Sequence, residues 1–175
     1  KDYIAKLYLE GAKMKMGSID TMNFIPEVSM EAKGLKFNNP EEFGGDPLLE
    51  FKEIKFDYGK TMADGGVHFR QVRMDIQRVN IVRNKKGLWL TDLMGEAQKK
   101  VQKMQDSKDS PAIDDLKITI AEISFQDLAT NDPPKVLKVG KVINANNTKN
   151  PRAYGLSVIL QLAGIVYEAK KKSGF

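Results

Sequence analysis

One spacing of apolar residues recurs four times in this chain and restricts the folds that it can adopt. Alternation of apolar and polar residues is typical of β-strands, because successive side chains of a strand point to opposite faces. In this chain the alternation is interrupted by a double step, apolar-x-apolar-x-x-apolar-x-apolar, which would move the apolar residues to the other face unless a bulge or sharp bend intervenes. The four occurrences are Leu49, Phe51, Ile54 and Phe56; Val67, Phe69, Val72 and Met74; Met74, Ile76, Val79 and Ile81; and Ile118, Ile120, Ile123 and Phe125.

The repeat predicts a sheet that bends at the same level in several strands. A sheet curved in this way would form a trough whose inner wall could hold a lipid acyl chain. Ordinary bulged strands, or strands with two apolar faces, are the alternative interpretation. The bends are expected near Lys52 and Glu53, near Arg70 and Gln71, and near Ala121 and Glu122. The lipid-facing wall would consist of Phe51, Ile54, Phe56, Phe69, Val72, Met74, Ile120, Ile123 and Phe125.

Strand-like segments dominate the chain. Loops between them contain glycine, proline, asparagine and aspartate in turn-forming combinations, as in residues 43–47 and 131–134. Consecutive strands joined by such loops most simply form an antiparallel meander. The predicted fold class is therefore α+β, mainly β: a curved, bulged antiparallel sheet with short N-terminal, middle and C-terminal helices. The predicted strands are residues 14–20, 27–37, 48–58, 67–75, 78–83, 116–126 and 135–143.

The length of 175 residues suits a single domain with an apolar core. Within it, Thr91 or Asp92 can cap a middle helix, and Asn150 can cap the last helix, with Pro151 in its first turn. The predicted division of domain 1–175 is an N-terminal helix at 1–12, β-sheet at 14–84, a helix at 91–105, a linker at 106–115, strands at 116–143 and an amphipathic helix at 150–172.

Composition excludes several classes of protein. Hydrophobic residues make up 41% and charged residues 29% of the chain, which is the balance of a folded domain rather than of a disordered segment. No run of 18 apolar residues occurs, so the sequence given contains no predicted transmembrane helix. The absence of cysteine excludes disulfides, thiolate metal sites and cysteine nucleophiles. The net charge of +5 is concentrated after residue 134, where eight lysines and arginines face one glutamate.

No group of residues has the spacing of a catalytic or metal site. His68 is the only histidine, and its alternation with Val67 and Phe69 predicts that it faces the wetter side of its strand. Replacement of His68 by alanine is therefore expected to leave fold and function nearly unchanged. Side chains of adjacent acidic pairs such as Asp114 and Asp115 diverge, unlike carboxylates that converge on a bond. We expect a chain that is not an enzyme and that uses no cofactor, metal or nucleic acid.

The C-terminal helix has more apolar surface than one sheet contact needs. One face carries Leu156, Ile159, Leu160, Ala163, Val166 and Tyr167, and a second face carries Val158, Leu162, Ile165 and Ala169. The second face, together with Lys170, Lys171 and Lys172, is the predicted contact with a membrane surface or a partner protein. Complete burial within the domain is the alternative.

The order of several motifs resembles the N-terminal module of the AsmA-like family. These motifs are Gly17-Ser18-Ile19-Asp20, Gly34-Leu35-Lys36-Phe37-Asn38-Asn39-Pro40 with Phe43 behind it, Leu49-Glu50-Phe51-Lys52-Glu53-Ile54, Val79-Asn80-Ile81-Val82-Arg83-Asn84 and Leu90-Thr91-Asp92-Leu93. The resemblance covers roughly residues 1–130. The chain differs in its short length and in Gln77-Arg78, where relatives often carry a glycine turn.

The resemblance implies a bacterial periplasmic protein, tethered to the inner membrane by a segment upstream of Lys1. It implies a role in envelope biogenesis, by binding or passing lipid acyl chains, and it supplies no catalytic residues. The alternative function is an accessory subunit that docks onto a larger membrane protein complex through its C-terminal helix. The sequence leaves the lipid, the partner and the oligomeric state open.

Overall fold

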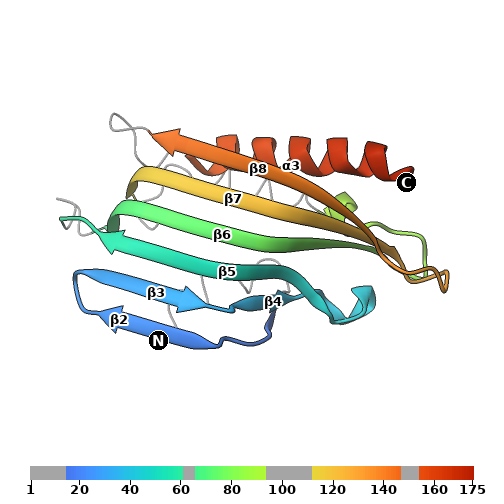
Figure 1. Cartoon of the computed structure of the whole chain (residues 1–175), viewed down its shortest axis with the longest axis horizontal. Helices are drawn as coiled ribbons and strands as arrows, with labels where there is room; N and C mark the ends of the chain where they lie inside the picture. The colour runs from blue at the N-terminus through green and yellow to red at the C-terminus, as the bar shows by residue number, and fades with distance from the viewer. Residues whose placement is uncertain (1–14, 61–65, 94–111, 147–153) are drawn as a thin grey trace.

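The computed structural model describes residues 15–60, 66–93, 112–146 and 154–175, which form a single curved sheet with one long helix on it (Figure 1). The sheet has eight strands, and the predicted mainly β class is confirmed. The predicted helix at 1–12, the caps Asn150 and Pro151, and most of the middle helix lie outside the described residues. The elements are β1 (Lys15–Met16), β2 (Thr21–Ile25), β3 (Ser29–Lys33), β4 (Lys36–Asn38), η1 (Glu41–Phe43), β5 (Pro47–Tyr58), β6 (His68–Arg83), η2 (Leu90–Leu93), β7 (Ala112–Asp127), β8 (Lys135–Asn146) and α3 (Tyr154–Ser173).

The strands follow one another across the sheet in the order β1, β4, β5, β6, β7 and β8, with β3 beside β5 and β2 beside β3. All pairs are antiparallel except β6 and β7, which run parallel from His68 beside Ala112 to Arg83 beside Asp127. The sheet is therefore mixed, and the meander prediction is wrong for this pair. The connection 84–111 is long enough to return the chain to the other end of the sheet, as a parallel pair requires.

Polar pairs on the outer face fix the register of β6 against β7. The Gln71 amide donates to Asp115 at 2.9 Å, the Thr119 hydroxyl donates to Asp75 at 2.7 Å, and Arg78 Nη2 donates to Glu122 at 2.8 Å. Each pair joins residues that are 44 positions apart in the sequence. A shift of one residue would break all of these contacts and turn every apolar side chain outwards.

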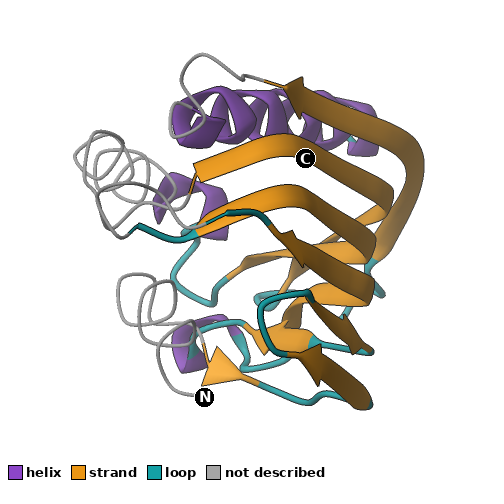
Figure 2. Ribbon diagram, turned by 90° about the vertical axis from the view of Figure 1, so that its left-hand side faces the viewer, coloured by secondary structure: helices purple, strands orange, loops and turns teal. Residues whose placement is uncertain are grey.

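The three predicted bends are confirmed. The pairing of β5 with β6 is irregular between Phe51 and Glu53 and again between Asp57 and Tyr58, opposite Arg70. The pairing of β7 with β8 is irregular between Ile120 and Glu122. Gly140 lies in β8 at this last bend with a φ of 52°, a conformation that side chains with a Cβ rarely adopt. Figure 2 shows that the bends curl the sheet around the side on which α3 lies.

Several predicted boundaries differ from the structure. The predicted strands 67–75 and 78–83 are one continuous strand, β6 (His68–Arg83), because the bulge at Gln77 bends the strand without ending it. The predicted linker 106–115 is too long, since β7 begins at Ala112. β2 was not predicted, and it pairs with β3 through a turn in which Glu27 has a φ of 58°. The described start of the middle helix, Leu90–Leu93, is a 3-10 turn.

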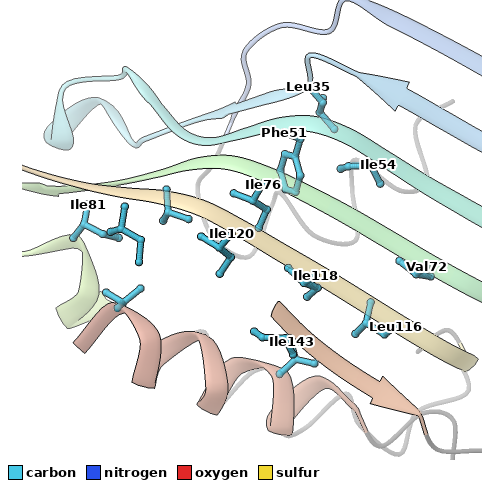
Figure 3. Close-up of a cluster of buried hydrophobic side chains, with 14 of the residues drawn as sticks. Leu35, Phe51, Ile54, Val72, Ile76, Ile81, Leu116, Ile118, Ile120 and Ile143 are labelled. Atoms are coloured by element: carbon cyan, nitrogen blue, oxygen red, sulfur yellow. The ribbon is translucent and has the colours of Figure 1, made fainter. Parts of the chain in front are cut away.

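The core lies on the inner face of the sheet, between β5, β6, β7 and β8 and the helix α3 (Figure 3). Phe125, Ile120 and Ile123 of β7 are almost completely buried there. α3 contributes Val158, Val166 and Ala169 to the same cluster. α3 therefore covers the inner face where the central strands meet β8.

Candidate functional site

Three rows of apolar side chains cross the inner face of the sheet from one edge to the other. Residues that pair across neighbouring strands share a face of the sheet, so the register defines each row. The rows are Phe24, Met30, Phe56, Val72, Leu116 and Ala145; Met22, Ala32, Ile54, Met74, Ile118 and Ile143; and Met16, Phe37, Leu49, Val79, Ile123 and Leu137. Each row crosses six strands, and the apolar repeat seen in the sequence thus becomes part of a continuous apolar surface over the eight strands.

Most of this surface is filled core rather than an open trough. Phe51 and Ile54 on β5 are 7% and 6% exposed, and Ile120 on β7 is 1% exposed. The predicted lipid-facing wall is therefore corrected: its side chains belong to the core, and the seven that are buried cannot meet a lipid in this conformation. The residues concerned are Phe51, Ile54, Phe69, Val72, Ile120, Ile123 and Phe125, which are buried, and Phe56 and Met74, which are partly buried.

The rows become exposed only at the side of the sheet formed by β1 and β2. Met16, Met22 and Phe24, which end the three rows, are 54%, 51% and 52% exposed. Ile19, Ile25 and Val28 are exposed in the same stretch of chain. We call residues 16–28 the β1–β2 margin. Concentrated exposed apolar surface marks an interaction site more often than scattered single residues do.

The face of the C-terminal helix that was predicted to meet a membrane or partner packs on the sheet instead, together with Val166 of the other predicted face. Val158 and Ala169 are buried, and Leu162 and Ile165 pack against the core, so this face is held by the chain's own sheet. It is not available to a membrane or partner, and this part of the predicted contact is corrected. The exposed face instead carries Leu160 and Tyr167, which were placed on the opposite apolar face. Burial depends on how α3 lies on β7 and β8, which helical spacing alone does not specify.

The three lysines after the helix do not share one environment. Lys170 Nζ lies 4.5 Å from the centre of the Trp89 ring, whereas Lys171 and Lys172 are exposed. Trp89 in turn stacks edge-on against Phe125 and Phe175, with ring centres 6.2 Å and 5.1 Å apart. Lys170 therefore has a structural role at the end of the core, and only Lys171 and Lys172 remain directed to solvent.

His68 is tied to two other segments. Its Nδ1 lies 2.9 Å from the backbone oxygen of Lys60, and its Nε2 lies 3.0 Å from Oδ1 of Asp114. Both ring nitrogens thus face acceptors, which suits the protonated ring. The hydrogen bond to Asp114 raises the pKa of His68 above its ordinary value of 6.5, and partial burial opposes this shift. His68 is half-buried and bonded, so the expectation that its replacement hardly affects the fold is revised.

Two shallow cavities among the described residues are lined by polar side chains. The first, about 360 Å³, is lined by acidic Glu41 and Glu42 and basic Lys85 and Lys86. The second, about 260 Å³, lies on the outer face, where the Ser124 hydroxyl donates to Asn80. Neither lining places a nucleophile beside a histidine. Within the described residues, no cluster of three or more histidine or acidic side chains could hold a metal ion.

In comparisons with known proteins, no family model, no curated protein and no solved structure matches this chain. The AsmA-like resemblance therefore remains a prediction. In the described part of the chain, no helix combines the length and hydropathy needed to cross a bilayer.

The β1–β2 margin is the feature that sequence reasoning missed. β2 carries Met22 and Phe24 at alternate positions, which is the signal of a strand with one apolar face. The segment is short, and the apolar wall was predicted from the longer repeats elsewhere, which form the core. Its significance depends on pairing with β3, which brings these two side chains into the rows.

Proposed function

We propose that this chain is a non-catalytic module of the cell envelope that contacts lipid acyl chains through the β1–β2 margin. The observation that carries the proposal is the course of the three apolar rows, which end in the half-exposed side chains of Met16, Met22 and Phe24. Methionine and phenylalanine are well suited to irregular apolar ligands, because methionine is flexible and phenylalanine presents a large apolar surface.

The resemblance to AsmA-like proteins supports a periplasmic location with a tether to the inner membrane. The margin lies at the edge of the sheet farthest from α3 (Figure 1), so an acyl chain could reach it without displacing the helix. Acyl chains would lie along the exposed end of the inner face, and the filled core behind it would serve as a rigid support.

Binding of a long-chain fluorescent fatty acid tests the proposal. The double variant Met22→Lys/Phe24→Lys should bind about 30-fold more weakly, because burying the exposed half of each side chain contributes about 1 kcal/mol. The matched control is Thr21→Lys/Ser29→Lys, which places the same two charges on the outer face of β2 and β3 and should bind as the wild-type chain does. Equal loss of binding in both double variants, or no binding by the wild-type chain, would contradict the proposal.

A second candidate function is an accessory subunit that docks through the exposed face of α3. Leu160 and Tyr167 are 53% and 68% exposed on that face, beside Lys171. Tyrosine is enriched both in protein interfaces and at membrane surfaces. The exposed apolar area is smaller than at the β1–β2 margin, which is why the margin carries the first proposal.

A further inference from the structure

The two long edges of the sheet differ in their protection against pairing with another strand. β8 carries Lys135, Lys138 and Lys141, and its pairing is irregular around Gly140. Lysines and bulges are the devices by which proteins prevent edge strands from pairing with other chains. The unpaired side of β8 is therefore guarded.

β2 has none of these devices. Its five residues, Thr21–Ile25, contain no charge and no proline, and its register with β3 is regular along its whole length. All five residues are exposed, and among the described residues β2 pairs only with β3. An uncharged, regular and apolar edge strand is a template for adding a further strand.

The sequence of β2 is complementary to itself in one antiparallel register. If two copies of β2 pair about a two-fold axis at Asn23, Met22 lies opposite Phe24 of the partner subunit, and Thr21 lies opposite Ile25 of the partner subunit. The apolar pair falls on the inner face, because Met22 and Phe24 share a face with the core through Ala32 and Met30. Aromatic and aliphatic side chains that face each other in this way stabilise a strand pair.

We propose that two copies of this chain form a dimer through antiparallel pairing of their β2 strands, with the axis at Asn23. Such an interface is isologous, since the same patch is used twice, and this is the commonest form of protein dimer. The flanking acidic residues do not oppose one another in this register: Asp20 faces Pro26 of the partner subunit, and Glu27 faces Ile19 of the partner subunit. The dimer goes beyond the proposed acyl contact and leaves the inner face of β2 open to it.

Sedimentation of the full chain over a range of concentrations tests this pairing. The wild-type chain should show a monomer–dimer equilibrium. In Asn23→Lys two like charges would meet about 4.5–5.5 Å apart at the axis, and the dimer dissociation constant should rise roughly a hundredfold. Asn23→Asp should have the same effect. An equimolar mixture of the two variants should dimerise again, because opposite charges then meet.

The control is Val142→Lys, which adds the same charge at an exposed position of the guarded edge, β8, and should dimerise like the wild-type chain. A wild-type chain that stays monomeric at all concentrations would overturn the proposal, and so would an Asn23→Lys/Asn23→Asp mixture that stays monomeric. The measured quantity is mass, so failure of fatty-acid binding would not be mistaken for failure of the dimer.

Discussion

His68 joins β6 both to the chain just after β5 and to β7 through two hydrogen bonds that its protonated ring satisfies at once. Because the folded-state pKa is raised above 6.5, this contribution is fully present below pH 6.5 and is lost as the pH rises through the folded-state pKa. The pair with Asp114 is partly exposed, so we expect it to contribute at most about 1 kcal/mol.

His68→Ala should therefore lower the melting temperature by ~2–4 °C at pH 5.5 and by less at pH 8.5. Thermal unfolding at the two pH values measures the difference. Asp114→Asn should likewise lower the melting temperature more at pH 5.5 than at pH 8.5, because it removes the charged acceptor of the protonated ring. A melting temperature of His68→Ala that falls more at pH 8.5 than at pH 5.5 would mean that the neutral ring, rather than the charged one, stabilises the fold.

Within the elements, two glycines with open space around them allow the effect of backbone conformation on stability to be measured without a change in packing. Gly140 in β8 and Gly164 in α3 have no atom within 4 Å of an added Cβ, but only Gly140 has a positive φ. Gly140→Ala should destabilise the chain by about 1 kcal/mol, because the left-handed conformation at the bend is unfavourable for alanine. Gly164→Ala should stabilise it by up to about 1 kcal/mol, because alanine favours helix. Chemical denaturation measures both.

If Gly140→Ala lowers the free energy of unfolding and Gly164→Ala raises it, the curvature of β8 depends on its backbone conformation. If Gly140→Ala were neutral, the bend at residues 120–122 of β7 would not depend on the conformation of its neighbour. The bends of β6 and β7 are expected to be less sensitive to single substitutions, because these strands keep a constant register against each other across the bulges.

For the whole molecule, the orientation of α3 decides which apolar residues are core. Leu162→Asp places a charge against the cluster and should cost ~2–4 kcal/mol, a large part of the stability of a typical domain. Leu160 lies on the exposed side of α3, so Leu160→Asp should lower the free energy of unfolding by under ~1 kcal/mol, because its side chain already contacts water. This order is the reverse of the one that the helix pattern by itself predicts.

Denaturation curves with near-ultraviolet circular dichroism distinguish the two variants. Leu160→Asp should retain the wild-type spectrum, and it also tests the second candidate function, since a folded Leu160→Asp chain should no longer be recovered in a complex that forms through α3. A Leu160→Asp chain that unfolds while Leu162→Asp stays folded would contradict the position of α3 on the sheet.

Local sequence patterns determined where most of the long strands and the C-terminal helix of this protein lie. Alternation with a double step sufficed to predict the position of the long strands β5, β6 and β7 and the levels of their bends, because side-chain period and bulge position are properties of a single strand. The turn residues around Pro47 and Pro134 delimited β5 and β8 for the same reason. The C-terminal helix was predicted from its spacing, and its described part, Tyr154–Ser173, agrees.

Only the tertiary structure decided which strands become neighbours and which faces are covered. The parallel pairing of β6 with β7 has no local signal in the sequence. Its register joins residues 44 positions apart, such as Gln71 and Asp115, whose polar side chains meet only in the fold. In the same way, Phe51 and Met22 are both large apolar residues at alternating apolar positions of a strand. Phe51 is core because strands flank β5 on both sides, and Met22 is surface because β2 is the last strand.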